Sequence, residues 1–463
     1  MANNQTEMSF ELINRILHYK GRQAINRLRF LAQASPSLSL AAYELALQTI
    51  TQSTWDIPLY KETLTAYNKI ATANDLPPLA ANQEWLDNTQ TETSLSLARL
   101  ENDLKHNTTN LIKDGIRTSY QELGNHYRRV GDLANAHRAF SKAREHATNA
   151  LHAAELSLAS LDLALDAENF KLAHSHAAKA QAGLDSLLGS LELKPNGTKN
   201  KPAAGSSLQL SSLPSDPKDP TEKDIERWTE RVNLVYALTS LAQGDFGGAL
   251  RYFLKVGGRE AGGDDGEELL ATVADIAMYA TLCGLAHLDR QQLKEQLIDR
   301  LEFRSVLDSE PRLRQILKLF RENKYREVFE YLSMSLPVYQ TDLYLYEQTE
   351  RLMGLIQERA IGQYFGSFSA ARLGRACEVF GWSMEGLEGR LEKSIRAGQL
   401  VGKLDLANGV LLLQHTPLTR QALLQDVHQS ATHIYSQSAA ALFRLKLISA
   451  DLLVAESHSV SAS

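Results

Sequence analysis

Two histidines separated by one residue are the closest match to a metal-binding motif in this sequence. His174 and His176 form a His-x-His pair, and Asp185 follows downstream. Zinc hydrolysis on such a pair requires both imidazoles on the same ion. The pair lies in an alanine-rich segment that predicts a helix, where residues two apart point about 200° away from each other. The sequence therefore predicts two solvated histidines and no metal site.

Other catalytic arrangements lack a matching pattern. Cys283 and Cys377 each stand alone in a helix-like stretch, so they predict neither a disulfide framework nor a thiolate metal cage. The run GGREAGG at 257–263 lacks the Lys-Ser/Thr of a nucleotide-binding loop, and no Gly-x-Ser-x-Gly nucleophile elbow occurs. We therefore expect no catalytic residue, no cofactor and no metal, and hence a protein that is not an enzyme.

Composition points to protein partners. Lys and Arg total 49 against 55 Asp and Glu, and the net charge of -6 gives no general attraction to nucleic acid or anionic lipid. No segment approaches about 18 consecutive apolar residues, and the N-terminus has no basic start followed by an apolar core. The sequence thus predicts a chain that is neither secreted nor membrane-spanning. With 463 residues, 43% of them hydrophobic, it can form two or three structural units.

A helix–turn–helix pattern stands out at residues 123–143. Gly131 and Asp132 would make the turn, small residues on the first helix would let the second approach closely, and an aromatic ring would fill the gap. The expected repeat core comprises Leu123, Gly124, Tyr127, Ala136, Phe140 and Ala143.

The pattern recurs twice and is similar to the tetratricopeptide repeat, although its closing proline is missing. One such hairpin cannot bury its apolar face alone, so the copies should stack into a right-handed solenoid that binds proteins. An ordinary packed helical domain is the alternative, because Ala and Leu recur at helical spacing there too. The second copy has Gly244 and Asp245 before Ala249, Phe253 and Val256, and the third has Asn169 before Ala173, Ala177 and Ala180.

Composition changes along the chain suggest its segments. A stretch rich in proline and serine at 193–224 predicts a disordered insertion, and a glycine-acid run at 257–268 predicts a loop. The expected segments are an N-terminal helical region at 1–115, the solenoid at 116–345, a winged-helix domain at 346–416, a long bundle helix at 417–456 and a disordered tail at 457–463.

Residues 369–414 predict the winged helix. Ser369 and Ser383 are expected to cap two helices, and Gly398 to end the second in a left-handed conformation. Two short apolar runs then flank Asn408 and Gly409, a dipeptide suited to a tight hairpin because both residues tolerate positive φ. The facing stripes of the two helices are Ala376 and Phe380 against Leu387, Leu391 and Ile395.

Two surfaces of this C-terminal part are expected to be subunit interfaces. An exposed wing strand can pair with a neighbour's strand, and a long helix with an apolar stripe needs a companion bundle. The wing residues are Leu400, Val401, Leu404, Val410, Leu411 and Leu413, and the helix residues are Leu423, Val427, Ile434, Leu445 and Leu452.

A winged helix can also read DNA, and the charges bear on that alternative. The second helix carries Arg390, Lys393 and Arg396, but three glutamates on the same helix balance them. Phosphate contacts supply most non-specific affinity for DNA, so a neutral helix disfavours this function.

Four segments together resemble one known family, COP9 signalosome subunit 1, along nearly the whole chain. Its typical N-terminal segment is similar to YKGRQAINRLRFLAQASP at 19–36, and its repeat to IRTSYQELGNHYRRVGDLANAHRAFSKAREHAT at 116–148. Residues 276–317 resemble its middle region, and residues 356–413 its PCI winged-helix domain, which proteasome-lid and translation-initiation subunits share.

This resemblance implies a non-catalytic scaffold in a complex that removes Nedd8 from cullins and regulates cullin-RING ubiquitin ligases. The implied partners are other PCI subunits, the metalloprotease subunits and neddylated ligases, with no nucleic acid and no membrane. The implied location is the cytoplasm and nucleus. A PCI subunit of the proteasome 19S lid, which shares the layout, is the alternative.

Overall fold

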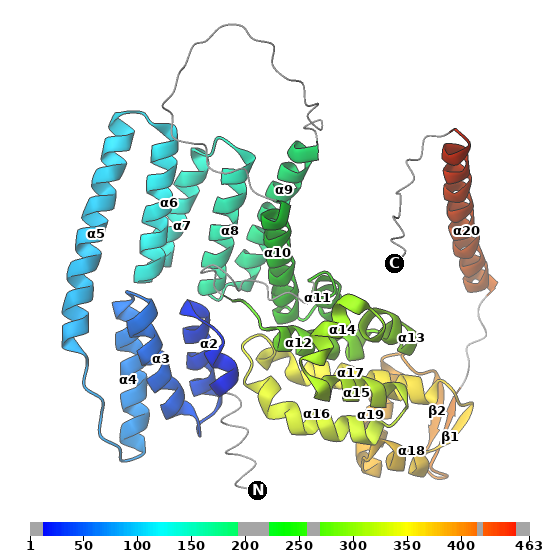
Figure 1. The fold of residues 1–463 in the computed structure, drawn as a ribbon. Helices are drawn as coiled ribbons and strands as arrows, with labels where there is room; N and C mark the ends of the chain where they lie inside the picture. Colours follow the sequence, from blue (N-terminus) through cyan, green and yellow to red (C-terminus); the bar gives the residue numbers. More distant parts are fainter. Residues whose placement is uncertain (1–12, 193–221, 257–268, 414–419, 451–463) are drawn as a thin grey trace, which may run out of the picture. The chain divides into compact units, whose positions relative to one another are not determined.

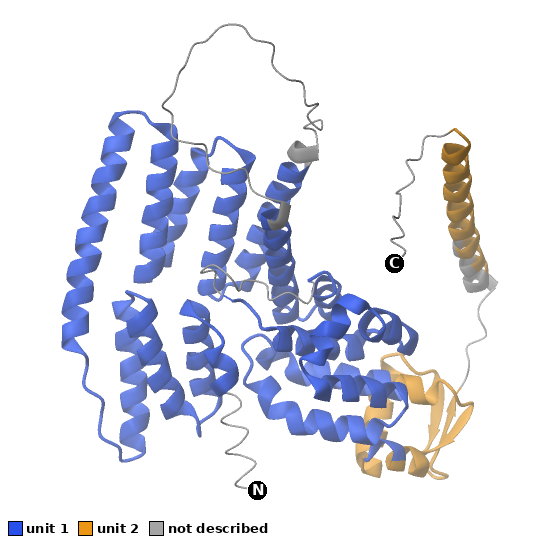
Figure 2. Cartoon of the chain, viewed as in Figure 1, with its two compact units in different colours: residues 1–361, 379–381 blue, residues 362–378, 382–463 orange. Residues whose placement is uncertain are grey.

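The computed structural model describes residues 13–192, 222–256, 269–413 and 420–450. Of the predicted insertion at 193–224, residues 193–221 lie outside the described part, whereas residues 222–224 already belong to a helix, so the insertion was predicted too long at that end. The predicted loop at 257–268 and tail at 457–463 also lie outside the described residues. The chain forms two compact units, residues 1–361 with 379–381 and residues 362–378 with 382–463 (Figure 2). The predicted fold class is confirmed: helical hairpins precede a winged helix and a long helix (Figure 1).

The first unit is a succession of helices, each packed on the next from α5 to α12. The helices α2, α3 and α4 precede this stack, and α13 to α17 follow it. The elements are α2 Gly21–Ala34, α3 Ser39–Ser53, α4 Ile57–Ala73, α5 Gln83–Thr109, α6 Lys113–Val130, α7 Leu133–Glu145, α8 Ala150–Asp166, α9 Phe170–Glu192, α10 Glu222–Ala242, α11 Phe246–Phe253, α12 Val273–His287, α13 Arg290–Leu293, α14 Leu301–Asp308, α15 Pro311–Arg321, α16 Tyr325–Gln340 and α17 Thr349–Phe365, with short turns of π-helix at Lys294–Ile298 and 3-10 helix at Tyr346–Gln348.

The three predicted repeats share one turn geometry. In the first hairpin, Gly131 adopts a left-handed φ of 93° and the Asp132 side chain accepts a hydrogen bond from the third residue of α7. In the hairpin of α10 and α11, Gly244 has a left-handed φ of 79°. The Asp245 side chain there accepts a hydrogen bond from the third residue of α11. A left-handed residue followed by a capping side chain thus reverses the chain and satisfies an unpaired amide.

The third copy uses the same turn without glycine. Glu168 takes the left-handed position with φ 54°, and Asn169 accepts from the amide of Leu172 at 3.1 Å. The small residues after each turn are fully buried, so second helices approach their neighbours closely. These buried positions are Ala136, Ala143, Ala173, Ala177, Ala180 and Ala249.

The second unit contains a three-stranded sheet with strand order β1-β3-β2. Its elements are β1 Ala370–Arg372, α18 Leu373–Phe380, α19 Met384–Arg396, β2 Gly402–Asp405, β3 Val410–Leu413 and α20 Arg420–Ser449. As the sequence predicts, Ser383 accepts from the amide of Gly386 to cap α19, and Gly398 follows that helix with φ 73°. Four predicted stripe residues, Ala376, Phe380, Leu387 and Leu391, are fully buried, and Ile395 is partly buried.

Two details of the winged helix differ from the prediction. Ser369 does not cap a helix, because residues 370–372 form β1 and the Ser369 carbonyl accepts from the amide of Leu413. The wing turn is also longer than expected: Asp405 pairs with Val410, so four residues connect the strands, and only Gly409 has positive φ. The Asp405 carboxylate accepts from the amides of Ala407 and Asn408, which stabilises this wider turn.

Candidate interaction sites

The wing sheet exposes two edges. β3 lies in the middle and pairs antiparallel with both β1 and β2, so within the described residues the outer edges of β1 and β2 have no strand partner. Unpaired amides and carbonyls at such an edge can accept a strand from another chain.

The six predicted wing residues divide between core and surface. Leu400, just before β2, and Leu411, in β3, are buried and belong to the core. Leu404, Val410 and Leu413 are partly buried, and Val401 is exposed just before β2. The exposed member of the set therefore lies next to β2, and Val410 and Leu413, three residues apart on β3, point to opposite faces of the sheet.

α20 exposes many apolar side chains to solvent. One line of its residues recurs at alternating steps of three and four, as in a coiled-coil seam, while Tyr435, Leu442 and Phe443 are exposed outside that line. Of the predicted set, Val427, Ile434 and Leu445 are 63%, 62% and 61% exposed. The Leu423 side chain and Leu452 lie outside the described part. Leu424, Ala431, Ser438, Ala441 and Ile448 complete the seam.

Two of the three basic residues of α19, Arg390 and Arg396, are engaged within the module. The Arg390 guanidinium lies 4.4 Å from the ring centre of Trp382 and donates to the carbonyl of Gly386 at 2.9 Å. Arg396 forms an ion pair with Glu392 at 2.6 Å. These contacts leave the surface of α19 without a basic face for a phosphate backbone.

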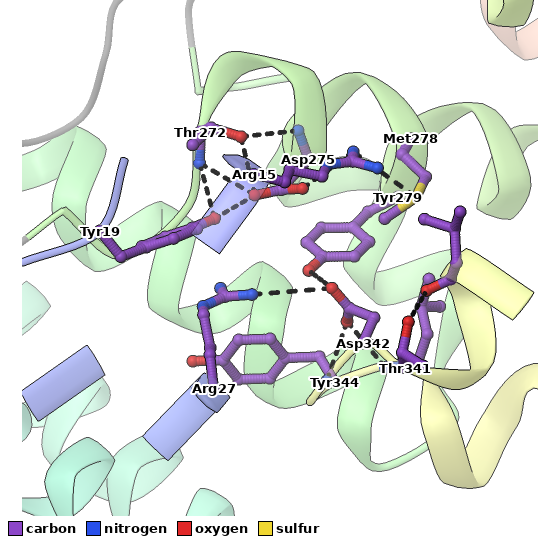
Figure 3. A network of polar contacts seen from close by, with 12 residues as sticks. Arg15, Tyr19, Arg27, Thr272, Asp275, Met278, Tyr279, Thr341, Asp342 and Tyr344 are labelled. Carbon is purple, nitrogen blue, oxygen red and sulfur yellow. Dashed lines mark hydrogen bonds and ion pairs between the residues drawn. The ribbon is translucent and has the colours of Figure 1, made fainter. Parts of the chain in front are cut away.

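A buried polar network joins the N-terminus to the middle of the chain (Figure 3). The Tyr19 hydroxyl donates to Asp275 and accepts from the amide of Thr272 at 3.1 Å. Arg15 contacts the same carboxylate at 2.9 Å. Because Tyr19 and Asp275 are 256 residues apart, α2 and its preceding turn are fixed against α12.

Arg27 is the second centre of this network. Its buried guanidinium lies 4.0 Å from the ring centre of Tyr19, donates to the carbonyl of Leu270 at 3.1 Å and stands 3.6 Å from Asp342. Asp342 in turn accepts from the Tyr279 hydroxyl at 2.7 Å. The buried guanidiniums and carboxylates of this network therefore pair with one another, because a buried charge without a partner would be strongly destabilising.

The two carboxylates of the network respond oppositely to their surroundings. Burial would raise the pKa of Asp275, but the nearby guanidiniums of Arg15 and Arg27 outweigh it and the pKa is lowered. Burial dominates at Asp342, whose pKa is raised although Arg27 opposes the shift. Asp275 is thus the firmly ionised member of the pair.

The sequence analysis missed this network. The sequence contains one indication of buried charges: arginines lie among the apolar residues of 19–36. In the structure Arg22 and Arg27 are both buried. Arg22 forms an ion pair with Asp56 at 2.6 Å and donates to the carbonyl of Arg128 at 3.0 Å. The N-terminal helices are therefore tied to the first repeat as well as to α12.

The structure also places the two candidate metal ligands. His174 contacts Thr239 of α10 at 3.2 Å, whereas the His176 ring meets His137 of α7. The imidazoles therefore turn toward different helices. The prediction of two solvated histidines is wrong for His176, which is 6% exposed because it packs against α7. Among the residues described, no three His, Cys, Asp or Glu side chains gather as metal ligands would, and no helix is both long and apolar enough to cross a membrane.

A polar cleft of about 380 Å³ lies between α5, α6 and the start of α4. Trp55 forms one wall, with the Arg129 guanidinium 5.5 Å from its ring centre and His126 edge-on to it. His126 contacts the Ser96 hydroxyl at 3.0 Å, and burial followed by the charge of Arg129 lowers its pKa. The cleft therefore places an imidazole with a lowered pKa beside an aromatic wall.

Comparison with known proteins identifies relatives over most of the chain. The model of the family described as 26S proteasome subunit RPN7 matches residues 82–296. COP9 signalosome complex subunit 1 of Emericella nidulans is 28% identical over 374 residues, covering 80% of this chain and 66% of the relative. The subunit 1 of Arabidopsis thaliana is 27% identical over 448 residues, covering 96% of this chain and 90% of the relative.

A proteasome relative matches a shorter part. The 26S proteasome non-ATPase regulatory subunit 6 of Dictyostelium discoideum is 29% identical over 133 residues, 29% of this chain and 35% of the relative. The similarity to signalosome subunits thus extends over far more of the sequence.

Proposed function

Because this chain is a homologue of COP9 signalosome subunit 1, we propose that it is a non-catalytic scaffold subunit of a signalosome. The observation that carries this proposal is the extent of similarity: 96% of the chain aligns with the Arabidopsis subunit, against 29% with the proteasome subunit of Dictyostelium. The role of a proteasome-lid subunit is the alternative, and the helical layout common to both families does not separate them.

Assembly takes place through the C-terminal part. The free edges of β1 and β2 support strand pairing with another winged helix, and the exposed seam of α20 supports a helical bundle with partner helices. An isolated helix that exposes so many apolar side chains is stabilised when partners bury them.

The complex acts by removing Nedd8 from cullins, and its metalloprotease subunits supply the chemistry. This chain contributes contacts to the neddylated cullin-RING ligase through its N-terminal helices and repeats, where the cleft beside Trp55 offers a polar surface. The complex works in the cytoplasm and the nucleus.

Affinity purification tests the assignment directly. A tagged full-length chain is expressed in its own cells, and the recovered subunits are identified and quantified by mass spectrometry. We expect other PCI subunits, a metalloprotease and cullins in the eluate, together with deneddylating activity. Recovery of proteasome ATPases and lid subunits in fixed stoichiometry, without a deneddylase, would favour the alternative.

The α20 seam is tested by a matched pair of substitutions. Ile434→Glu places a charge in the seam, whereas His433→Glu places one on the neighbouring polar side of the same exposed helix. We expect Ile434→Glu to reduce recovery of partner subunits about tenfold or more, and His433→Glu to leave recovery unchanged. Equal recovery of the two variants would contradict a bundle formed by this seam.

DNA binding by the winged helix is the second function to test. The engagement of Arg390 with Trp382 and of Arg396 with Glu392 disfavours it. A duplex titration at low salt should show no binding that weakens steeply with added salt.

A further inference from the structure

Two histidine rings meet between α7 and α9, and neither ring belongs to the buried network. The ring centroids of His137 and His176 are 5.6 Å apart with the planes at 60°. The residues come from the second helices of consecutive hairpins, so their contact lies at the junction of two repeats.

His176 is 6% exposed, and its Nε2 atom is buried without a hydrogen-bond partner among the described residues. A buried polar nitrogen left unpaired destabilises the folded chain, and a bound polar group would relieve that cost. The position therefore calls for a ligand atom that can pair with an imidazole nitrogen.

The groups that surround His176 are cationic. Lys179 follows it by three residues on α9, and Arg144 follows His137 by seven residues on α7, so each cation lies on the same helix face as its histidine. Burial lowers the pKa of His176, and Lys179, His137 and Arg144 lower it further, with no carboxylate among the contributing groups. Lys179 and Arg144 are exposed and have no ion pair recorded within the described part of the chain.

We propose that His137, His176, Arg144 and Lys179 form a site for a phosphate group, free or carried on a phosphorylated side chain. The two cations supply charge at the rim, and the two imidazoles supply N–H donors at the base, the combination that oxyanions require. An anion here pairs the Nε2 of His176 and offsets the positive charge of Arg144 and Lys179. This site is independent of the role in a signalosome, because it uses neither the wing nor α20.

Titration of the full-length chain with inorganic phosphate and with blocked phosphoserine tests the site. The side-chain signals of ¹³C-labelled histidines are followed by NMR at constant pH and ionic strength, with chloride as the balancing salt, and His176→Gln assigns the signal of that ring. We expect saturable shifts of His176 and His137, and a higher pKa of His176 in the bound state because the anion's charge offsets the surrounding cations.

Charge-matched variants separate a site from general attraction. Lys179→Gln and Arg144→Gln should each weaken phosphate binding about fivefold or more. The control Lys142→Gln removes an equal charge from the last turn of α7, where the Lys142 ammonium lies over the Tyr120 ring. That control should change affinity less than about twofold.

The two probes distinguish the sources of the phosphate group. Tighter binding of phosphoserine supports a phosphorylated partner segment, and equal or tighter binding of inorganic phosphate supports the free ion. Unchanged histidine signals with both probes, or equal weakening by Lys142→Gln and Lys179→Gln, overturns the proposal.

Discussion

The ring of Phe140 packs directly against the backbone of Gly124. A Cβ atom added at Gly124 would stand 2.6 Å from Cε1 of Phe140, closer than real Cβ atoms approach any neighbour. Phe140 is 1% exposed and packs with Leu156 and Leu163 of α8, so it cannot easily move away. This pair therefore sets the distance between α6 and α7 and joins the hairpin to the next one.

We expect Gly124→Ala to destabilise the protein by about 1–3 kcal/mol, because overpacking outweighs the better helix propensity of alanine. The control is Gly183→Ala in α9, where the new Cβ would lie 3.5 Å from the Cα of Ala154, an ordinary contact. That variant should be neutral or more stable by up to about 1 kcal/mol. Thermal unfolding of both variants measures the difference, and equal midpoints would contradict the packing described.

Removing the ring itself should be more damaging. Phe140→Ala is expected to cost about 3–5 kcal/mol, because a large side chain leaves a cavity between two hairpins. Chemical denaturation followed by circular dichroism measures the loss. An unchanged free energy of unfolding would show that the hairpins do not depend on this ring.

The left-handed turn residues give a pair of opposite predictions. Gly131→Ala should be destabilising by about 2 kcal/mol, because φ is 93° and the new Cβ would stand 2.0 Å from the Asp56 carboxylate. Glu168→Gly should stabilise by up to about 1 kcal/mol, because glycine relieves the strain of a φ of 54°. Calorimetric midpoints test both, and a less stable Glu168→Gly protein would count against strain at that turn.

Stability should depend on pH through Asp275. Its pKa is lowered in the folded chain, so ionised Asp275 contributes stability that is present above its unfolded pKa of about 3.9 and is lost as pH falls through the lower folded value. Asp275→Asn should therefore destabilise the protein strongly at pH 7, and the difference from the natural chain should shrink toward pH 3. Denaturant unfolding at several pH values gives this difference, and a constant difference would refute the mechanism.

A chain that ends at residue 416 should keep the thermal stability of the first unit. The described side chains of α20 are exposed except for Leu447, which is partly buried, so its loss removes little packing. The same chain should fail to enter the complex, because the α20 seam is absent. Wild-type incorporation measured by mass spectrometry would argue against the proposed assembly.

Local features of the fold could be predicted because neighbouring residues produce them. Gly131 with Asp132 and Gly244 with Asp245 identify their turns, since a left-handed residue and a capping carboxylate act within one helical turn. The prediction for Ser369 was wrong because it used local information alone. A serine suits a helix cap, but the hydrogen bond from Leu413, 44 residues away, decides the structure at this position. Sequence periodicity contains no information on that pairing.

Of the candidate sites, the seam of α20 could be predicted from the sequence, whereas the buried polar network could not. The apolar seam of α20 follows a spacing that any helix imposes, so the sequence alone determines which residues share that face. The network of Tyr19, Arg27, Asp275 and Asp342 required the tertiary structure, because polar side chains give no periodic signal of burial. Their partners come from segments about 250 residues away, and only the folded chain brings those charges close enough to offset the cost of leaving water.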